Sequence, residues 1–233
     1  MPASRPGSIA IVGGGIGGLA AALSRLRTLR TDLGGHPDEA DSCRAVVAVR
    51  SVVSHTFVTL DGVAAPDTVI DTIVSMRNSR EILDDFFARV ADEDAMLLGR
   101  VTYEEWADFW PGADIEPFAS HINGVPKYVF TRSLQSAPWG ERDNATVVDD
   151  LSETVARLKE QPGKNIGVHG SPTLVESLLH ADLLDEMRLE IYPLLAGTGK
   201  RLFSDGQPPK RLRLAESRIT THGVPLLSYR REA

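Results

Sequence analysis

The residues from Asp94 to Tyr103, DAMLLGRVTY, combine residue types that bind an anionic group. The apolar run Ala95 to Leu98 predicts a buried strand, Gly99 ends it, and Thr102 is placed to cap the following helix. Free backbone N–H groups and the positive end of a helix dipole meet at such a corner, and Arg100 adds a charged donor fork. The segment indicates a phosphate site, although an ordinary strand–helix corner has the same pattern.

A second strand–glycine–helix corner follows the predicted strand Asn165 to His169. The chain continues as Gly170-Ser171-Pro172 into a helix predicted over Thr173 to His180, and proline suits the first turn of a helix. This corner therefore predicts a second anion site. We interpret His169 as a structural or pocket-edge residue rather than as a ligand.

An acidic residue, Asp61, lies at the end of a strand predicted over Ala45 to Leu60, within FVTLDG (57–62). Ligand sites of α/β sheets lie at the carboxyl ends of the strands, and the residue precedes a flexible glycine turn. Asp61 is therefore a candidate catalytic and substrate-side residue. The alternative is that it only forms the Asp-Gly turn.

The N-terminal segment Ile9 to Leu23 contains a G-x-G-x-x-G pattern and resembles the opening of flavin-dependent monooxygenases. A dinucleotide fold also needs a second strand that ends in an acid about twenty residues later. Asp32 stands near that distance, but no predicted strand precedes it. We therefore treat residues 1–44 as a glycine-rich extension and linker outside the core, and a flavin site there as the weaker alternative.

Composition excludes several classes of function. The formal net charge of −7 argues against broad binding to nucleic acid or to an anionic membrane surface. The single cysteine, Cys43, excludes an intrachain disulfide framework and a multi-cysteine zinc site. No apolar run reaches the roughly 18 residues of a membrane span. We expect a cytoplasmic protein without a metal site.

The order of the elements predicts an α/β fold. Strands and helices alternate from Ala45 to His180, which indicates a mainly parallel sheet with helices on both faces. The last two strands add an antiparallel edge. The predicted strands are Ala45 to Leu60, Ala95 to Leu98, Lys127 to Thr131, Ala145 to Val148, Asn165 to His169, Glu186 to Tyr192, Arg211 to Ser217 and Val224 to Arg230.

Helix caps follow from side chains that can accept a backbone N–H bond. We predict a helix capped by Asn78 or Ser79 that ends at Val90, a helix through Trp106 to Trp110 that stops at Pro111-Gly112, and a helix that Ser152 caps. The compact domain is predicted to span residues 45–233.

Five segments in order resemble the bacterial bifunctional deaminase–reductase C-terminal domain family. They are FVTLDG, LLGRVTYEEW, PKYVFTRS, VHGSPTL and LLDEMRLEIYPLLAGTGKRLF, and the similarity runs from about Arg50 to Tyr229. That family has the dihydrofolate reductase fold and includes the reductase half of the riboflavin-pathway enzyme. The resemblance implies an NADPH-dependent oxidoreductase, similar to 5-amino-6-(5-phosphoribosylamino)uracil reductase, that works as a homodimer on a small pyrimidine- or pterin-like substrate.

The resemblance also assigns residues by their place in these segments. Gly99, Arg100 and Thr102 would hold the cofactor phosphates, and Thr131 and Arg132 would face the adenosine 2′-phosphate. The pyrophosphate would lie on Gly170, Ser171, Pro172, Thr173 and Leu174. Asp61 and Glu186 would lie on the substrate side.

The chain also departs from the family. It lacks the zinc-deaminase signature H-x-E with P-C-x-x-C, so no deaminase half is present. It also lacks the acid-bearing helix that follows the first loop in true dihydrofolate reductases, which argues against folate as the substrate. A non-catalytic nucleotide-binding homodimer is the main alternative function.

Overall fold

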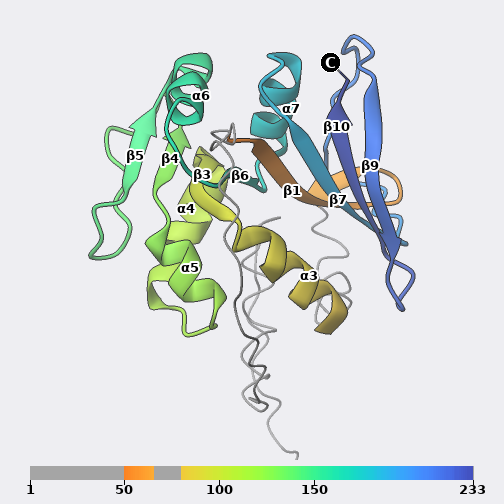
Figure 1. Cartoon of the computed structure of the whole chain (residues 1–233), viewed down its shortest axis with the longest axis horizontal. Coiled ribbons are helices and arrows are strands. Elements are labelled where there is room, and N and C mark those ends of the chain that lie inside the picture. The colour runs from red at the N-terminus through yellow and green to blue at the C-terminus, as the bar shows by residue number, and fades with distance from the viewer. Residues whose placement is uncertain (1–49, 66–79, 233) are drawn as a thin grey trace, which may run out of the picture.

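An eight-stranded sheet forms the centre of the molecule (Figure 1). The computed structural model describes residues 50–65 and 80–232, so the N-terminal glycine motif, the linker and the predicted caps Asn78 and Ser79 lie outside the described residues. The sheet has the order β5-β4-β3-β6-β1-β7-β10-β9. Its strands are β1 (Val52–Thr59), β3 (Glu93–Gly99), β4 (Lys127–Phe130), β5 (Ala145–Val148), β6 (Asn165–His169), β7 (Glu186–Tyr192), β9 (Leu212–Ile219) and β10 (Pro225–Arg231).

The sheet is parallel except at one edge. The pairs from β5 through to β7 run parallel, and β10 pairs antiparallel with both β7 and β9. Every residue of β1 is buried, as expected for a central strand covered on both faces. These observations confirm the predicted mainly parallel sheet with an antiparallel C-terminal edge.

Helices cover both faces of the sheet, as predicted (Figure 1). The helices are α3 (Arg80–Val90), α4 (Arg100–Phe109), α5 (Phe118–Gly124), α6 (Leu151–Lys159) and α7 (Pro172–His180). A 3-10 turn, Trp110–Gly112, ends α4 at the predicted proline and glycine. None of the helices among the described residues is long and apolar enough to cross a membrane.

The two faces of the sheet have separate cores. The core under α3, α4 and α5 is rich in aromatic side chains, whereas the core under α6 and α7 is mostly aliphatic. The aromatic core includes Phe86, Trp106, Trp110, Phe118 and Trp139. The aliphatic core includes Leu97, Val155, Leu158, Ile166, Val168, Leu174 and Leu178.

Two predicted helix caps are wrong. Helix α4 begins at Arg100 after Gly99, without a side-chain cap, because the Thr102 hydroxyl bonds elsewhere, to Ser171. Helix α6 is capped by Asp150, whose carboxylate accepts the Glu153 N–H, and not by Ser152. The error at α6 arose because two neighbouring polar residues, Asp150 and Ser152, could serve as the cap.

The sequence analysis also missed one helix and one small sheet. It placed no helix at α5, and it did not predict the antiparallel pair of β2 (Val63–Ala65) with β8 (Lys200–Arg201). This pair follows β1 in the chain. It brings the residues just after Asp61 next to the residues just before Leu202.

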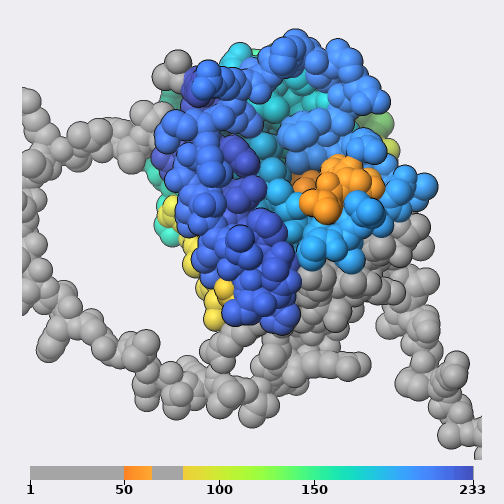
Figure 2. Space-filling model, turned by 90° about the vertical axis from the view of Figure 1, so that its right-hand side faces the viewer, coloured from red at the N-terminus to blue at the C-terminus, as the bar shows by residue number. Residues whose placement is uncertain are grey.

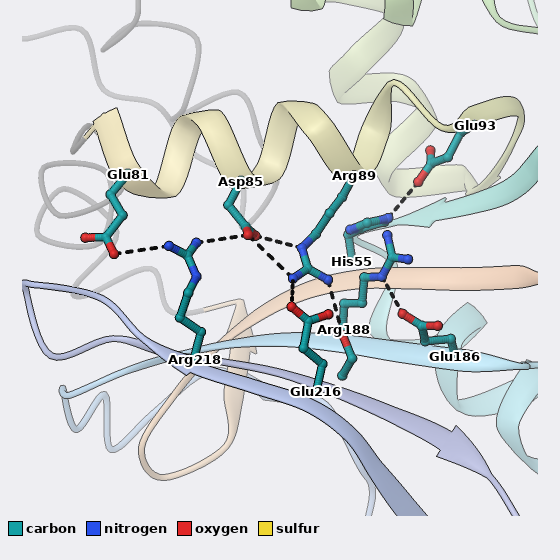
Figure 3. Close-up of polar contacts among 10 residues, drawn as sticks. His55, Glu81, Asp85, Arg89, Glu93, Glu186, Arg188, Glu216 and Arg218 are labelled. Carbon is teal, nitrogen blue, oxygen red and sulfur yellow. Dashed lines mark hydrogen bonds and ion pairs between the residues drawn. The ribbon is translucent and has the colours of Figure 1, made fainter. Parts of the chain in front are cut away.

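Ion pairs of alternating sign connect α3 to β9 (Figure 3). Arg218 of β9 contacts both Glu81, at 3.2 Å, and Asp85, at 2.9 Å. Asp85 also pairs with Arg89 at 2.7 Å, and Arg89 reaches Glu216 at 3.2 Å. The network holds α3 over the antiparallel edge of the sheet.

Candidate functional site

A cavity of about 440 Å³ opens where the two predicted anion corners meet. The first turns of α4 and α7 form its walls, and Lys200 of β8 reaches it from the small two-stranded sheet. The lining residues are Gly99, Arg100, Val101, Thr102, Glu105, Phe130, Ser171, Pro172, Thr173, Leu174, Ser177 and Lys200. The structure therefore brings both corners into one site.

The cavity has the electrostatics of an anion site. Two helix N-termini face it, so the positive ends of two helix dipoles point toward the cavity. Lys200 adds a cation, and its Nζ donates to the hydroxyl of Thr173. Arg100 lines the cavity while pairing with Glu104 at 2.7 Å, so this guanidinium is shared with a carboxylate of its own helix.

Ser171 joins the two corners through its hydroxyl. Its Oγ accepts the Gly99 N–H at 2.9 Å and lies 2.7 Å from the Thr102 Oγ1. The residue has a left-handed backbone, with φ 48° and ψ 67°, next to Gly170 with φ 57°. A non-glycine residue in this region is strained, and the two hydroxyl contacts hold it there.

Most of the predicted cofactor residues line this cavity. Gly99, Arg100, Thr102, Ser171, Pro172, Thr173 and Leu174 all do so, and Gly170 directly precedes them in the chain. Thr131 and Arg132 do not line it. They follow Phe130, which does, and Arg132 is exposed.

Several lining residues were missed from the sequence. Phe130 was read only as part of a buried strand, and Lys200 only as the end of a glycine turn. Lys200 follows a turn in which Gly197 and Gly199 have positive φ, but no local pattern in the sequence marks it as a cavity residue.

The carboxylate of Asp61 is fully engaged with neighbouring donors. It accepts the Thr59 hydroxyl at 2.5 Å and the backbone N–H groups of Ala196 at 3.1 Å and Gly197 at 2.8 Å. The Thr59 hydroxyl first, and then the two amides, lower the pKa of Asp61 to about 2. The group is therefore ionised at neutral pH.

The structure places Glu186 away from the cavity. It begins β7, at the opposite end of a strand that runs parallel to β1, and it is buried. Its two oxygens accept from Arg188 at 2.6 Å and from Arg230 at 2.9 Å. The pair with Arg188 lies within β7, and the pair with Arg230 connects β7 to β10.

A buried cluster of two histidines and a glutamate lies beneath α3 and α4. The Glu93 carboxylate contacts the Nε2 atoms of His55, at 2.6 Å, and His169, at 2.7 Å, and all three side chains are buried. The imidazole rings stack with their centroids 5.2 Å apart. We call these residues the His-Glu-His cluster. The sequence analysis interpreted His169 as a structural or pocket-edge residue but found neither Glu93 nor His55.

The charge state of the cluster follows from its contacts. Burial would raise the pKa of Glu93, but the two imidazoles hold that pKa well below its usual range. Burial lowers the pKa of His55, against the opposing pull of Glu93. Because a carboxylate only accepts hydrogen bonds, the His169 Nε2 that bonds to it carries a hydrogen. His55 also lines a small cavity under α3, together with Asp85, Arg89, Arg188 and Glu190.

The protein should lose stability as the pH falls from 7.5 to 5. The pKa of His55 is lower in the folded state than its ordinary 6.5, so the unfolded chain binds more protons over this range. His121 should change the stability in the same direction, because burial lowers its pKa too. Urea unfolding at both pH values should show a smaller free energy of unfolding at pH 5.

Two variants test the origin of this pH dependence. His55→Gln should reduce the difference in the free energy of unfolding between pH 7.5 and pH 5. His222→Gln, at an exposed position, should leave that difference unchanged. A free energy of unfolding in the unchanged protein that is equal at both pH values, or higher at pH 5, would contradict the assignment.

The strand order, the crossover helices and the cavity at the carboxyl edge of the sheet define the class of protein as dihydrofolate reductase-like. Within this class the sequence matches the RibD C-terminal domain over residues 50–226. The chain belongs to the RibD C-terminal domain family, as the sequence analysis expected.

Two proteins of Bacillus subtilis (strain 168) are similar in sequence. YyaP is 30% identical over 142 residues, which is 58% of this chain and 73% of that protein. YwjB is 30% identical over 180 residues, which is 76% of this chain and 96% of that protein.

Solved structures share the fold at low sequence identity. A putative riboflavin biosynthesis protein from Shewanella sp. PV-4 has a TM-score of 0.66 at 21% identity, covering 78% of this chain and 99% of that one. A pyrimidine reductase-like protein from Corynebacterium diphtheriae has a TM-score of 0.58 at 13% identity, covering 81% and 95%. A deaminase and 5-amino-6-(5-phosphoribosylamino)uracil reductase from Thermotoga maritima has a TM-score of 0.55 at 15% identity, covering 79% of this chain and 57% of that one.

Proposed function

We propose that the protein is an NADPH-dependent reductase that transfers a hydride to a C=O or C=N bond of a small pyrimidine- or pterin-like substrate. The observation that carries the proposal is the cavity between the N-termini of α4 and α7, with Lys200 at its side. Membership of the RibD C-terminal domain family supports it. The names of the similar pyrimidine reductase-like and uracil reductase structures give the substrate class.

The residues of the cavity fit a dinucleotide diphosphate. The amides at the start of α4 and α7 would bind phosphate oxygens, and the hydroxyls of Thr102 and Thr173 and the cations Arg100 and Lys200 would add donors. Thr131 and Arg132, beside Phe130, would face the adenosine 2′-phosphate. NADPH would supply the hydride, and the protein would bind and orient both reactants.

In this proposal Asp61 orients neighbouring groups and does not donate a proton. Its carboxylate is ionised and holds three donors, which makes it a poor proton source at neutral pH. Glu186, which the sequence analysis assigned to the substrate side, is ion-paired at the other end of the sheet, and we give it no contact with the substrate.

The direct test is oxidation of NADPH, followed at 340 nm, with a panel of pyrimidines, pterins and small carbonyl compounds. Turnover with one class of substrate would support the proposal. Binding of NADPH without any turnover would favour the alternative, a non-catalytic nucleotide-binding protein. Absence of NADPH binding would contradict both functions. A yellow purified protein would instead support a flavin site in the N-terminal segment.

NADPH should bind more tightly than NADH because of Arg132. A charge-assisted bond from arginine to the 2′-phosphate contributes about 1.5–3 kcal/mol, roughly a ten- to hundredfold preference. Arg132→Ala should weaken NADPH binding and spare NADH binding, measured by nucleotide fluorescence. Arg213→Ala, at an exposed position on β9, is the matched control. Equal affinities for the two nucleotides in the unchanged protein would contradict this assignment.

We further propose that the reductase domain spans residues 45–233 and works as a homodimer in the cytoplasm. The family match that begins at residue 50 supports this boundary. The outer strand β9 exposes Leu214 and Ile219, the latter 71% exposed. Exposed apolar side chains on an edge strand favour pairing with a second copy.

A further inference from the structure

Asp61, which lies outside the glycine turn that carries Lys200, bonds to that turn. The turn runs from Leu194 to Lys200, and its residues from Gly197 onward are exposed. The amides of Ala196 and Gly197 donate to the two carboxylate oxygens of Asp61, at 3.1 Å and 2.8 Å. Because a carboxylate accepts two such bonds at once, this contact fixes the turn at its start.

Backbone contacts around Asp61 strengthen the same attachment. Arg201 donates to the Asp61 carbonyl at 2.6 Å, and the Leu202 N–H donates to the Gly62 carbonyl at 3.0 Å. β2 also pairs with β8 through Val63 and Arg201. In Figure 2 the orange residues around β2 lie among blue residues of this later part of the chain.

The far end of the turn reaches the anion cavity. Lys200 lines that cavity, and its ammonium donates to the Thr173 hydroxyl in the first turn of α7. Only two residues separate Lys200 from Gly197, whose amide Asp61 holds. Asp61 and the cavity are therefore connected through one short, exposed segment.

We infer that Asp61 is a positioning residue that acts through Lys200: it clamps the 194–200 turn so that the Lys200 ammonium lies at a phosphate of the bound nucleotide. The inference rests on the proposed function for its ligand, a nucleotide diphosphate. It differs from a substrate-side role for Asp61, which would leave cofactor affinity unchanged.

The contacts favour the clamp over proton donation. Both carboxylate oxygens already accept hydrogen bonds, and the donors are a neighbouring hydroxyl and two amides of the turn. The same donors keep the group ionised, since they favour the carboxylate. Asparagine in this place offers one acceptor atom and would present an NH₂ group to the second donor.

The test compares Asp61→Asn, Lys200→Ala and the double variant by titration with NADPH. Each single variant should bind NADPH roughly tenfold more weakly, as expected for loss of one charge-assisted phosphate contact. The double variant should bind no more weakly than the weaker single variant, because both changes remove one interaction. Lys200→Arg should retain binding. Asp205→Asn, an exposed acid beyond the turn, should bind like the unchanged protein.

Hydrogen exchange of the ligand-free protein gives a second readout. The amides of Ala196 and Gly197 should exchange faster in Asp61→Asn than in the unchanged protein. In Lys200→Ala their exchange rates should rise less. Unchanged exchange at both amides in Asp61→Asn would overturn the clamp.

The outcomes separate this inference from the proposed function. If the unchanged protein binds NADPH and Asp61→Asn binds it equally well while losing kcat, the inference is wrong and Asp61 belongs to the substrate side. Additive losses in the double variant would also overturn the inference. If the unchanged protein does not bind NADPH, the proposed function is wrong, and the role of Lys200 is wrong with it.

Discussion

Replacing Glu93 by alanine is expected to lower the free energy of unfolding by about 3–5 kcal/mol. The carboxylate is 2% exposed and contacts two buried imidazoles, at 2.6 Å and 2.7 Å. Alanine would leave the two buried imidazoles without their carboxylate partner and open a cavity between the sheet and α3. A buried polar group left without a partner costs about 1–3 kcal/mol, and the two imidazoles account for most of the expected loss.

Urea unfolding followed by tryptophan fluorescence measures this effect, since the Trp106 ring lies 5.6 Å from the His169 ring. Glu93→Gln keeps the shape and one acceptor, so its loss should be smaller. Glu104→Ala removes an exposed carboxylate paired with Arg100 and should change the free energy by less than about 1 kcal/mol. A loss below about 1 kcal/mol for Glu93→Ala would contradict a stabilising cluster.

Gly167→Ala should cost about 3 kcal/mol or more. Alanine is ordinarily favoured over glycine inside a strand, by roughly 0.5–1 kcal/mol. Here an added Cβ would lie 1.9 Å from the Glu93 Oε2 and 2.3 Å from its Cδ. The carboxylate cannot move away from the added methyl group without losing its 2.7 Å contact with His169. The destabilisation from overpacking therefore adds to that from the lost ion pair.

The same unfolding measurement in the Glu93→Ala background tests this explanation. With the carboxylate removed, the added methyl group has room, and Gly167→Ala should then have little further effect. Gly112→Ala, where a Cβ meets nothing within 4 Å, should be tolerated in the unchanged protein. Additive losses from Gly167→Ala and Glu93→Ala would place the clash elsewhere.

The fold was predictable because its signals are local. Short apolar runs bounded by glycine, proline or acidic residues placed the strands Ala145–Val148, Asn165–His169 and Glu186–Tyr192 at their observed ends. The glycines after β3 and β6 marked both anion corners. Helix caps were less predictable, since a hydroxyl such as that of Thr102 can bond to a distant residue instead of to its own helix.

The parts of the site that could not be predicted depend on contacts between distant segments. His55, Glu93 and His169 are far apart in the sequence, and each stands in a strand whose pattern is otherwise apolar. Nothing local distinguishes a buried glutamate with two partners from an exposed one at a strand start. Lys200 reaches the cavity only because β8 pairs with β2, and two such short strands leave almost no pattern in the sequence.

The Ser171 hydroxyl has a consequence for how the cavity can admit a ligand. Because one oxygen bonds to both Gly99 and Thr102, the entrances to α4 and α7 form a single rigid wall. Such a wall favours binding of a ligand, because the donor groups of the wall need not be ordered when the ligand binds. A nucleotide diphosphate would therefore meet a surface that is already formed, to which the turn held by Asp61 adds Lys200.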